Sequence, residues 1–233
     1  MVRLIRNDSE EHLKRPLCDI AYEAIYRKII TLELEPGSLL DEKTLIKQIG
    51  LGRTPIREAL FRLYSDMVIE SNPSKGFFVR PITLQDTKAV FEALRIIELG
   101  IAELVVKSDL QAVMPLMEQA NREVEQAVTE GNVVGLVDAN YQFHLAFYDA
   151  SSNRFLLQAL RHVRVETRRL AFLSFSREID SARTLRDHYQ SVIDDHWEMV
   201  AALKEKNEDL LKAVITRHIE TFRRRMMMYL MPE

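Results

Sequence analysis

Apolar residues recur every three or four positions along most of the chain, which is the spacing of amphipathic helices. In the first third this pattern stops at two glycine-containing segments, Glu35-Pro36-Gly37 and Gly50-Leu51-Gly52. It predicts a first helix from about Leu17 to Glu33, a short second helix capped near Asp41, and a third that carries Leu60 and Leu63 inward. VIE and FFVR then form short strands around the turn NPSKG. Together these elements make a winged helix-turn-helix.

From Leu84 onward the helical period continues with no competing strand pattern. The apolar positions from Val90 to Leu104 predict one long helix, which five further helices with short polar joints follow. We expect those five at about Leu110 to Thr129, Val133 to Ala150, Arg154 to Phe175, Ala182 to Lys204 and Glu208 to Leu230. The chain is therefore expected to be mainly α, with a winged helix-turn-helix in residues 1–80 and an all-α antiparallel bundle in residues 84–233.

The composition changes this picture little. Hydrophobic residues make up 47% of the chain and charged residues 29%, which is typical of a folded, helix-rich protein. Cys18 is the only cysteine, so an intrachain disulfide is excluded. The first residues lack the apolar core of a signal peptide, and no run approaches the roughly 18 apolar residues of a membrane helix. We expect a soluble, cytoplasmic protein with no membrane partner.

The distribution of charge points to nucleic acid more than the net charge of -3 does. From Lys43 to Arg62 there are five basic residues and one acid, Glu58. The third helix is the recognition helix of such a module, and it enters the major groove by its N-terminal end. The side chains expected to meet DNA are Arg53, Thr54 and Arg57 on that helix, Lys43 one helix earlier, and Lys75 at the hairpin tip. Solvated surface arginines are the simpler interpretation for an isolated pair, but here the surrounding pattern favours DNA.

The first domain contains the stretch ELEPGSLLDEKTLIKQIGLGRTPIREALFRLYSDMVIESNPSKGFFV. This stretch, with its PG, RTPIREAL and KGFFV elements, resembles the N-terminal domain of the GntR superfamily of bacterial transcription regulators. The resemblance implies contacts to double-stranded DNA by Lys43, Arg53, Thr54, Arg57, Lys75 and Gly76. The family usually has serine where Gly52 stands and glycine where Asp66 stands. Because aspartate tolerates left-handed backbone, we expect the turn at Asp66 to survive.

Histidines in the bundle suggest a metal site. NYQFH places Asn140 and His144 one turn apart on one helix face. His196 lies ten residues before Lys206 and His218 eleven after Asn207, so each stands roughly 15 Å from the predicted turn EKNED. Three imidazoles and one oxygen suit a divalent transition metal such as zinc, nickel or manganese. Each histidine alone is more simply a core or surface residue, and we interpret His12, His162 and His188 in that way.

The bundle also contains the segments NYQFHLAFYDASSNRFL, DDHWEMVAALKEKN and ITRHIETF. They are similar to the FCD domain, the all-helical ligand-binding domain of the FadR-type branch of the same superfamily. The resemblance implies a metal site made of Asn140, His144, His196 and His218. Asparagine in place of the commoner aspartate removes a negative charge, which should weaken metal affinity or shift metal preference.

The same resemblance implies that Arg95 lies near the effector pocket, where it could clamp a carboxylate. Pairing of Arg95 with Glu92 or Glu98 is the alternative. Arg164 and Arg168 are further candidates for the cavity wall, without a pattern of their own to support them.

These observations predict a homodimeric transcription regulator that binds a palindromic operator and responds to a small effector, a carboxylate held by the metal and Arg95. Two alternatives stay open. One is a metal-dependent hydrolase activity in the bundle, which the absence of a general base placed by motif disfavours. The other is a regulator whose metal is purely structural.

Overall fold

The computed structural model describes residues 15–231, so His12 lies outside the described residues. The chain divides into two compact units, Met1–Pro81 and Ile82–Glu233. Within the described residues, no helix is long and apolar enough to cross a membrane.

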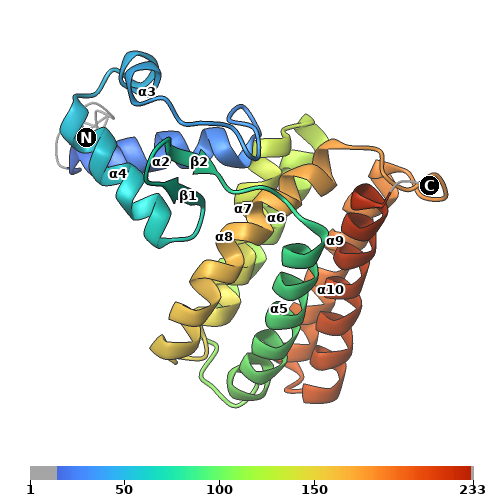
Figure 1. Ribbon diagram of the computed structural model, residues 1–233. Helices are drawn as coiled ribbons and strands as arrows, with labels where there is room; N and C mark the ends of the chain where they lie inside the picture. Colours follow the sequence, from blue (N-terminus) through green and yellow to red (C-terminus); the bar gives the residue numbers. More distant parts are fainter. Residues whose placement is uncertain (1–14, 232–233) are drawn as a thin grey trace, which may run out of the picture. The chain divides into compact units, whose positions relative to one another are not determined.

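The first unit consists of three helices followed by a hairpin (Figure 1). Its elements are α2 (Leu17–Ile30), α3 (Glu42–Ile49), α4 (Arg53–Ser65), β1 (Ile69–Asn72) and β2 (Gly76–Val79). The strands pair antiparallel, with Ile69 opposite Val79 and Asn72 opposite Gly76. The predicted winged helix-turn-helix is confirmed.

Local chemistry explains the helix-turn-helix. The carboxylate of Asp41 accepts a hydrogen bond from the backbone N–H of Thr44 at 2.8 Å and so caps α3. Gly50 ends α3 with a φ of 76°, a left-handed conformation that glycine adopts without steric cost. Gly52 is the N-cap of α4 and has no side chain to complete the cap. The apolar positions of α4 are buried as expected, with Leu60 and Leu63 fully enclosed.

The turn after α4 differs from the expectation at one residue. Asp66 has a φ of -81°, and the left-handed residue is its neighbour Met67, with a φ of 58°. Asp66 is instead held by tertiary contact, because its carboxylate accepts a hydrogen bond from the Tyr22 hydroxyl at 2.6 Å. Arg62 lies over the Tyr22 ring and pairs with Asp19 at 2.7 Å. These contacts tie α2 to α4.

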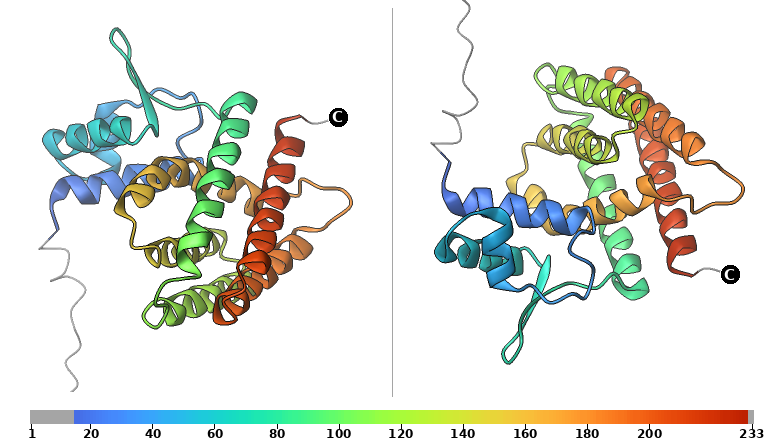
Figure 2. Two further views of the ribbon diagram at one scale, coloured as in Figure 1. Left: turned by 90° about the horizontal axis from the view of Figure 1, so that it is seen from below. Right: turned by 90° about the horizontal axis from the view of Figure 1, so that it is seen from above.

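The second unit is a bundle whose helices form a closed ring. Its elements are α5 (Leu84–Val105), α6 (Met114–Glu130), α7 (Val133–Asp149), α8 (Arg154–Ser176), α9 (Leu185–Lys204) and α10 (Glu208–Leu230). Around the ring, α5 packs on α8, α8 on α7, α7 on α6, α6 on α9, α9 on α10, and α10 on α5. Figure 2 shows these helices from below and from above. This arrangement confirms the all-α bundle.

Most helix ends lie where the polar joints of the sequence predict them. Asn132, Asn153 and Asn207 cap α7, α8 and α10 through their side-chain oxygens. The structure differs from the prediction at the starts of α6 and α9, which begin at Met114 and Leu185 and not near Leu110 and Ala182. At α9 the reason is a capping box, in which the side chains of Thr184 and Asp187 satisfy each other's backbone N–H groups.

Substituting Gly50 by alanine is expected to destabilise the first unit by about 1–2 kcal/mol, the cost of a left-handed conformation for an L-residue. A Cβ at this position would meet nothing within 4 Å, so the cost comes from the backbone alone. Urea unfolding of the full chain measures the change in unfolding free energy. The control is Gly52→Ser, where φ is -67° and an added cap should change stability by only a few tenths of a kcal/mol. Equal stability of the two variants would contradict the left-handed turn.

Candidate metal centre, ligand cavity and nucleic-acid interface

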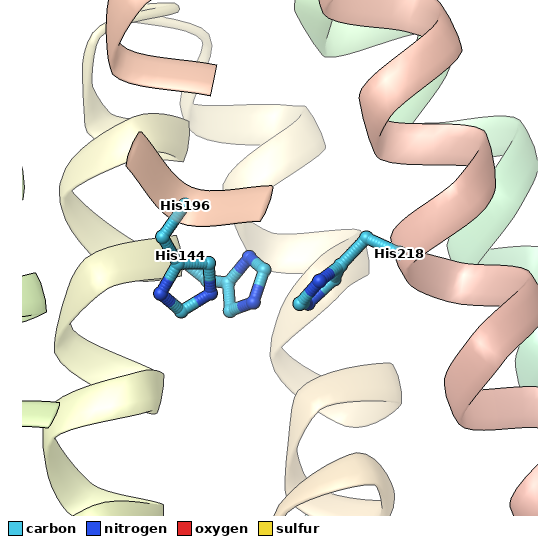
Figure 3. A group of neighbouring side chains, drawn as sticks. All are labelled: His144, His196 and His218. Carbon is cyan, nitrogen blue, oxygen red and sulfur yellow. The ribbon is translucent and has the colours of Figure 1, made fainter. Parts of the chain in front are cut away.

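Three histidines from three helices of the bundle point toward one another (Figure 3). They are His144 on α7, His196 on α9 and His218 on α10, and one nitrogen of each lies within 4.8 Å of the others. Their ring centroids are separated by 5.2 to 5.3 Å. His144 and His196 are buried, while His218 is half-buried. Helix packing thus assembles the three histidines to which the sequence assigns a joint site.

Hydrogen bonds decide which nitrogen of two rings is available. His196 Nδ1 lies 2.9 Å from Oδ1 of Asn121, and Asn121 Nδ2 donates to the Ile193 carbonyl at 3.2 Å, which fixes the amide orientation. Since an amide oxygen only accepts, His196 carries its proton on Nδ1. His218 Nδ1 likewise lies 3.2 Å from Oδ2 of Asp195. Both rings therefore use Nδ1 for a protein partner, which leaves Nε2 as the nitrogen that can bind a metal. Histidines that bind metals are commonly oriented by such partners.

Burial favours the neutral form of two of these histidines. It lowers the pKa of His144 and of His196 well below the usual value, and the nearby Arg164 charge lowers both further. Neutral imidazole is the form that binds a metal. Nδ1 of His144 and Nε2 of His196 are buried with no hydrogen-bond partner. Buried nitrogens without a partner are costly unless something binds them, so this donor set fits a divalent transition metal.

His144 and His218 line a cavity in the centre of the bundle, and so does Asn140, one turn before His144 on α7. The cavity leaves about 620 Å³ between side-chain atoms, its open mouth included, but only about 30 Å³ can be reached by the centre of a water molecule. A ligand at this place would be small and in close contact with the wall.

The arginines that reach this cavity are the further candidates Arg164 and Arg168, and not Arg95. Arg95 is exposed and is not among the lining residues, although its neighbours on α5, Leu94 and Glu98, are. Because successive helical residues are rotated by about 100°, Arg95 cannot share the inward face of Leu94. Arg164 and Arg168, on α8, both line the cavity, and Arg164 is only 7% exposed.

A buried carboxylate holds Arg164 in place. Oε1 of Glu98 accepts hydrogen bonds from the Arg164 guanidinium and from the Tyr148 hydroxyl, and the guanidinium lies 4.8 Å from the centre of the Tyr148 ring. Burial raises the pKa of Glu98, and the Arg164 charge opposes that shift. Arginine does not deprotonate in proteins, so Arg164 is charged, and its charge and hydrogen bond favour the ionised form of Glu98. Nε of Arg164 is buried with no partner, which leaves a donor beside the cavity.

All six residues assigned to DNA contact are exposed on the first unit: Lys43, Arg53, Thr54, Arg57, Lys75 and Gly76. One carboxylate organises the two arginines. Glu42 accepts a hydrogen bond from Nε of Arg57 at 3.1 Å, and its other oxygen lies 3.7 Å from Nε of Arg53. Because each arginine uses Nε, its terminal nitrogens stay available for a base or a phosphate. The sequence contains no pattern that singles out Glu42.

Sequence reasoning missed the residues that orient the histidines. Asn121 is a fully buried asparagine in the middle of α6, where asparagine is a poor helix former. The same signal drew attention to Asn140 and would have served for Asn121. Asp195 precedes His196 directly, and no spacing rule pairs it with His218 on the next helix.

Two protein families match the chain. Residues 18–79 match the bacterial regulatory proteins, gntR family, and residues 89–221 match the FCD domain. Similar proteins include the uncharacterized HTH-type transcriptional regulator YdhC of Bacillus subtilis, 25% identical over 84% of this chain and 85% of that protein. Another is the HTH-type transcriptional regulator McbR of Escherichia coli, 28% identical over 76% of this chain and 77% of that protein.

Solved structures share the fold. Escherichia coli McbR/YncC has a TM-score of 0.77 at 20% identity and covers 92% of this chain and 98% of its own. A putative transcriptional regulator GntR from Rhodococcus sp. RHA1 has a TM-score of 0.72 at 19% identity, over 90% and 97% of the two chains.

Substituting Glu98 by glutamine is expected to lower the unfolding free energy by about 3–5 kcal/mol, because it leaves Arg164 buried without its counter-charge. Urea unfolding of the metal-free chain at neutral pH measures the change. Glu103→Gln is the control on the same helix, since exposed Glu103 pairs with Lys212 at 2.6 Å and should contribute less than about 1 kcal/mol. A small, equal effect in both variants would mean that Glu98 is protonated in the fold.

Proposed function

The chain belongs to the gntR family of bacterial regulatory proteins and carries an FCD domain, and from this premise we propose that it is an operator-binding regulator controlled by a metal-assisted carboxylate ligand. It is a transcriptional regulator with a DNA-binding winged helix-turn-helix. The observation that carries the finer proposal is the histidine cluster, which has two buried nitrogens without a partner and two members, His144 and His218, that line a cavity inside the FCD domain. We propose a regulator and no enzymatic activity, in line with its relatives.

The proposed DNA-binding face is the start of α4 with its flanks. Arg53, Thr54 and Arg57 would enter the major groove, where arginine can donate two bonds to a guanine. Lys43 would bind a phosphate, and Lys75 with Gly76 would approach the backbone or minor groove from the hairpin. Glu42 supports this role because it holds both arginines without using their forked ends. We further propose that the protein acts as a cytoplasmic homodimer on a palindromic operator, since one such unit reads only a half-site.

The proposed metal site consists of His144, His196 and His218, with Asn140 as the fourth ligand. Asn121 and Asp195 would keep the Nε2 lone pairs of His196 and His218 directed at the ion. A zinc, nickel or manganese ion bound here would supply an open coordination position for a carboxylate oxygen. Asparagine adds no negative charge, so an anionic ligand would meet a site that is more positive than one with aspartate.

Arg164 takes the role of carboxylate partner in this proposal. It lines the same cavity as His144 and His218, is buried, and keeps an unused Nε–H. Glu98 holds one side of the guanidinium, so the side chain needs little ordering when a ligand binds. The ligand would regulate operator binding by favouring one arrangement of the two DNA-binding units of the dimer, because half-sites need a fixed spacing.

Arg57→Ala is expected to weaken specific DNA binding by about 1–3 kcal/mol and to relax base preference at one position of each half-site. The measurement is fluorescence anisotropy on an operator that the wild-type protein selects from random duplexes. Arg161→Ala removes an equal charge from an exposed position of the second unit and should leave affinity unchanged. Equal losses on selected and unrelated DNA would show that Arg57 binds phosphate only.

His196→Ala is expected to abolish zinc binding, and Asn121→Ala to weaken it by about 10- to 100-fold through loss of ring orientation. Competition with a chromogenic chelator measures both affinities, and His162→Ala is the control because His162 lies outside the cluster.

Unchanged zinc affinity in His196→Ala would reject the site. A purely structural metal would show itself differently: removing zinc would lower the melting temperature but leave the affinity for carboxylates intact below melting.

A further inference from the structure

A second polar cluster borders the cavity and has no part in the proposed metal site. Its centre is His188 on α9, which lines the cavity and is only 4% exposed. Its Nε2 lies 3.0 Å from the hydroxyl oxygen of Ser174 on α8. Ser174 is in turn bonded to Arg225 of α10, a side chain that is 2% exposed. Three helices of the ring thus meet in this cluster.

The direction of each hydrogen bond follows from donor counts. Arg225 Nε donates to the Ser174 hydroxyl at 3.1 Å, because a guanidinium has only donors. The hydroxyl has one proton and a second lone pair, so it could also accept from His188. Donation to Nε2 of His188 is favoured, because within the described residues this nitrogen is the one acceptor for the buried hydroxyl proton. Burial, helped by the Arg225 charge, lowers the pKa of His188 to about 3, so the ring is neutral. A neutral ring that accepts at Nε2 carries its proton on Nδ1.

At one end of this hydrogen-bonded chain His188 has an N–H without an acceptor, and at the other end Arg225 has a charge without an ion-pair partner in the part of the chain that the structure describes. Nδ1 of His188 is buried with no hydrogen-bond partner. Arg225 donates its Nη2 to the carbonyls of Ser174 and Arg177. The carboxylates of Asp180 and Glu178 act on its charge, but neither forms an ion pair with it among the described residues. A buried positive charge that polarises a hydroxyl and an imidazole toward one free N–H favours an anion at that N–H.

The two polar ends of the cavity are separated along α9. His188 and Asp195 both line it and are seven residues apart, which places them on one helix face about 10 Å apart along the axis. Asp195 is hydrogen-bonded to His218 of the histidine cluster. The free volume of the cavity is small, which favours an unbranched chain over a branched one.

We propose that the cavity binds an unbranched dicarboxylate, with one carboxylate at the histidine cluster and Arg164 and the other accepting the Nδ1–H of His188. The first half of this inference rests on the proposed function, and the second half on the Arg225–Ser174–His188 chain alone. Ser174 acts as a positioning residue, because it fixes which nitrogen of His188 faces the ligand with a proton.

Calorimetric titration of the zinc-loaded full chain tests whether each polar end of the cavity binds one carboxylate of the same ligand. Succinate, glutarate and adipate are compared with butyrate, valerate and caproate of matched chain length. We expect one dicarboxylate to bind about tenfold or more tightly than its matched monocarboxylate, the value of one charge-assisted hydrogen bond. His188→Phe should remove this preference, while His162→Phe, outside the cavity wall, should keep it.

The outcomes separate the two proposals. Monocarboxylate binding that needs zinc, with no preference for dicarboxylates, would overturn the second subsite and leave the proposed function standing. A preference that survives His188→Phe would also overturn it. If neither series binds the zinc-loaded protein, the carboxylate ligand of the proposed function falls and this inference falls with it.

Nitrogen-15 NMR of the histidine rings provides a test that needs no ligand. The signals of His188, assigned by their loss in His188→Phe, should show the tautomer with its proton on Nδ1. A proton on Nε2 would overturn the donor chain. If His188→Phe fails to fold, Ser174→Ala replaces it in both experiments. This variant removes the hydroxyl between Arg225 and His188 and should reduce the preference for dicarboxylates.

Discussion

The need to satisfy polar atoms inside an apolar helical ring is the constraint on which the second unit depends. Each buried charge or ring nitrogen there costs free energy unless a partner meets it. Glu98 meets Arg164, Asn121 meets His196, and Asp195 meets His218. These pairings also set the direction in which each functional group faces. Three atoms left without a protein partner, Nε of Arg164 and Nδ1 of His144 and His188, belong to residues that line the cavity.

Supporting residues reach the site from every helix of the ring. The histidines come from α7, α9 and α10, while Asn121 comes from α6, Glu98 from α5 and Arg164 from α8. Sites built on packed helices hold their geometry better than sites on loops. Because residues of α5, α7, α8, α9 and α10 line the cavity, its shape depends on how these helices pack against one another. This coupling is what a regulator requires, because a ligand must prefer one packing state to bias the protein.

At the surface of the first unit a carboxylate also orients arginine side chains. Glu42 lies on α3 and organises two arginines of α4, just as Glu98 organises Arg164 in the bundle. The exposed pair gains little stability from this contact, since solvent screens it. Its value lies in orientation, because arginines held by Nε keep their forked ends for a partner. Tyr22, Asp66 and Arg62 then fix α4 on α2, so the recognition helix has a rigid base.

The sequence alone determined which elements form, because helix periodicity, glycine turns and polar caps are local properties. It placed the winged helix-turn-helix, the helices of the bundle with ends near Asn132, Asn153 and Asn207, and the three histidines on facing helices. Only the tertiary structure decided which faces meet. It put Arg164 and not Arg95 at the cavity, and Met67 and not Asp66 in the left-handed turn. It also joined His188 to Ser174 and Arg225, which no spacing rule connects. Periodicity defines the inward face of a helix, but the partners across that face depend on how all the helices pack together.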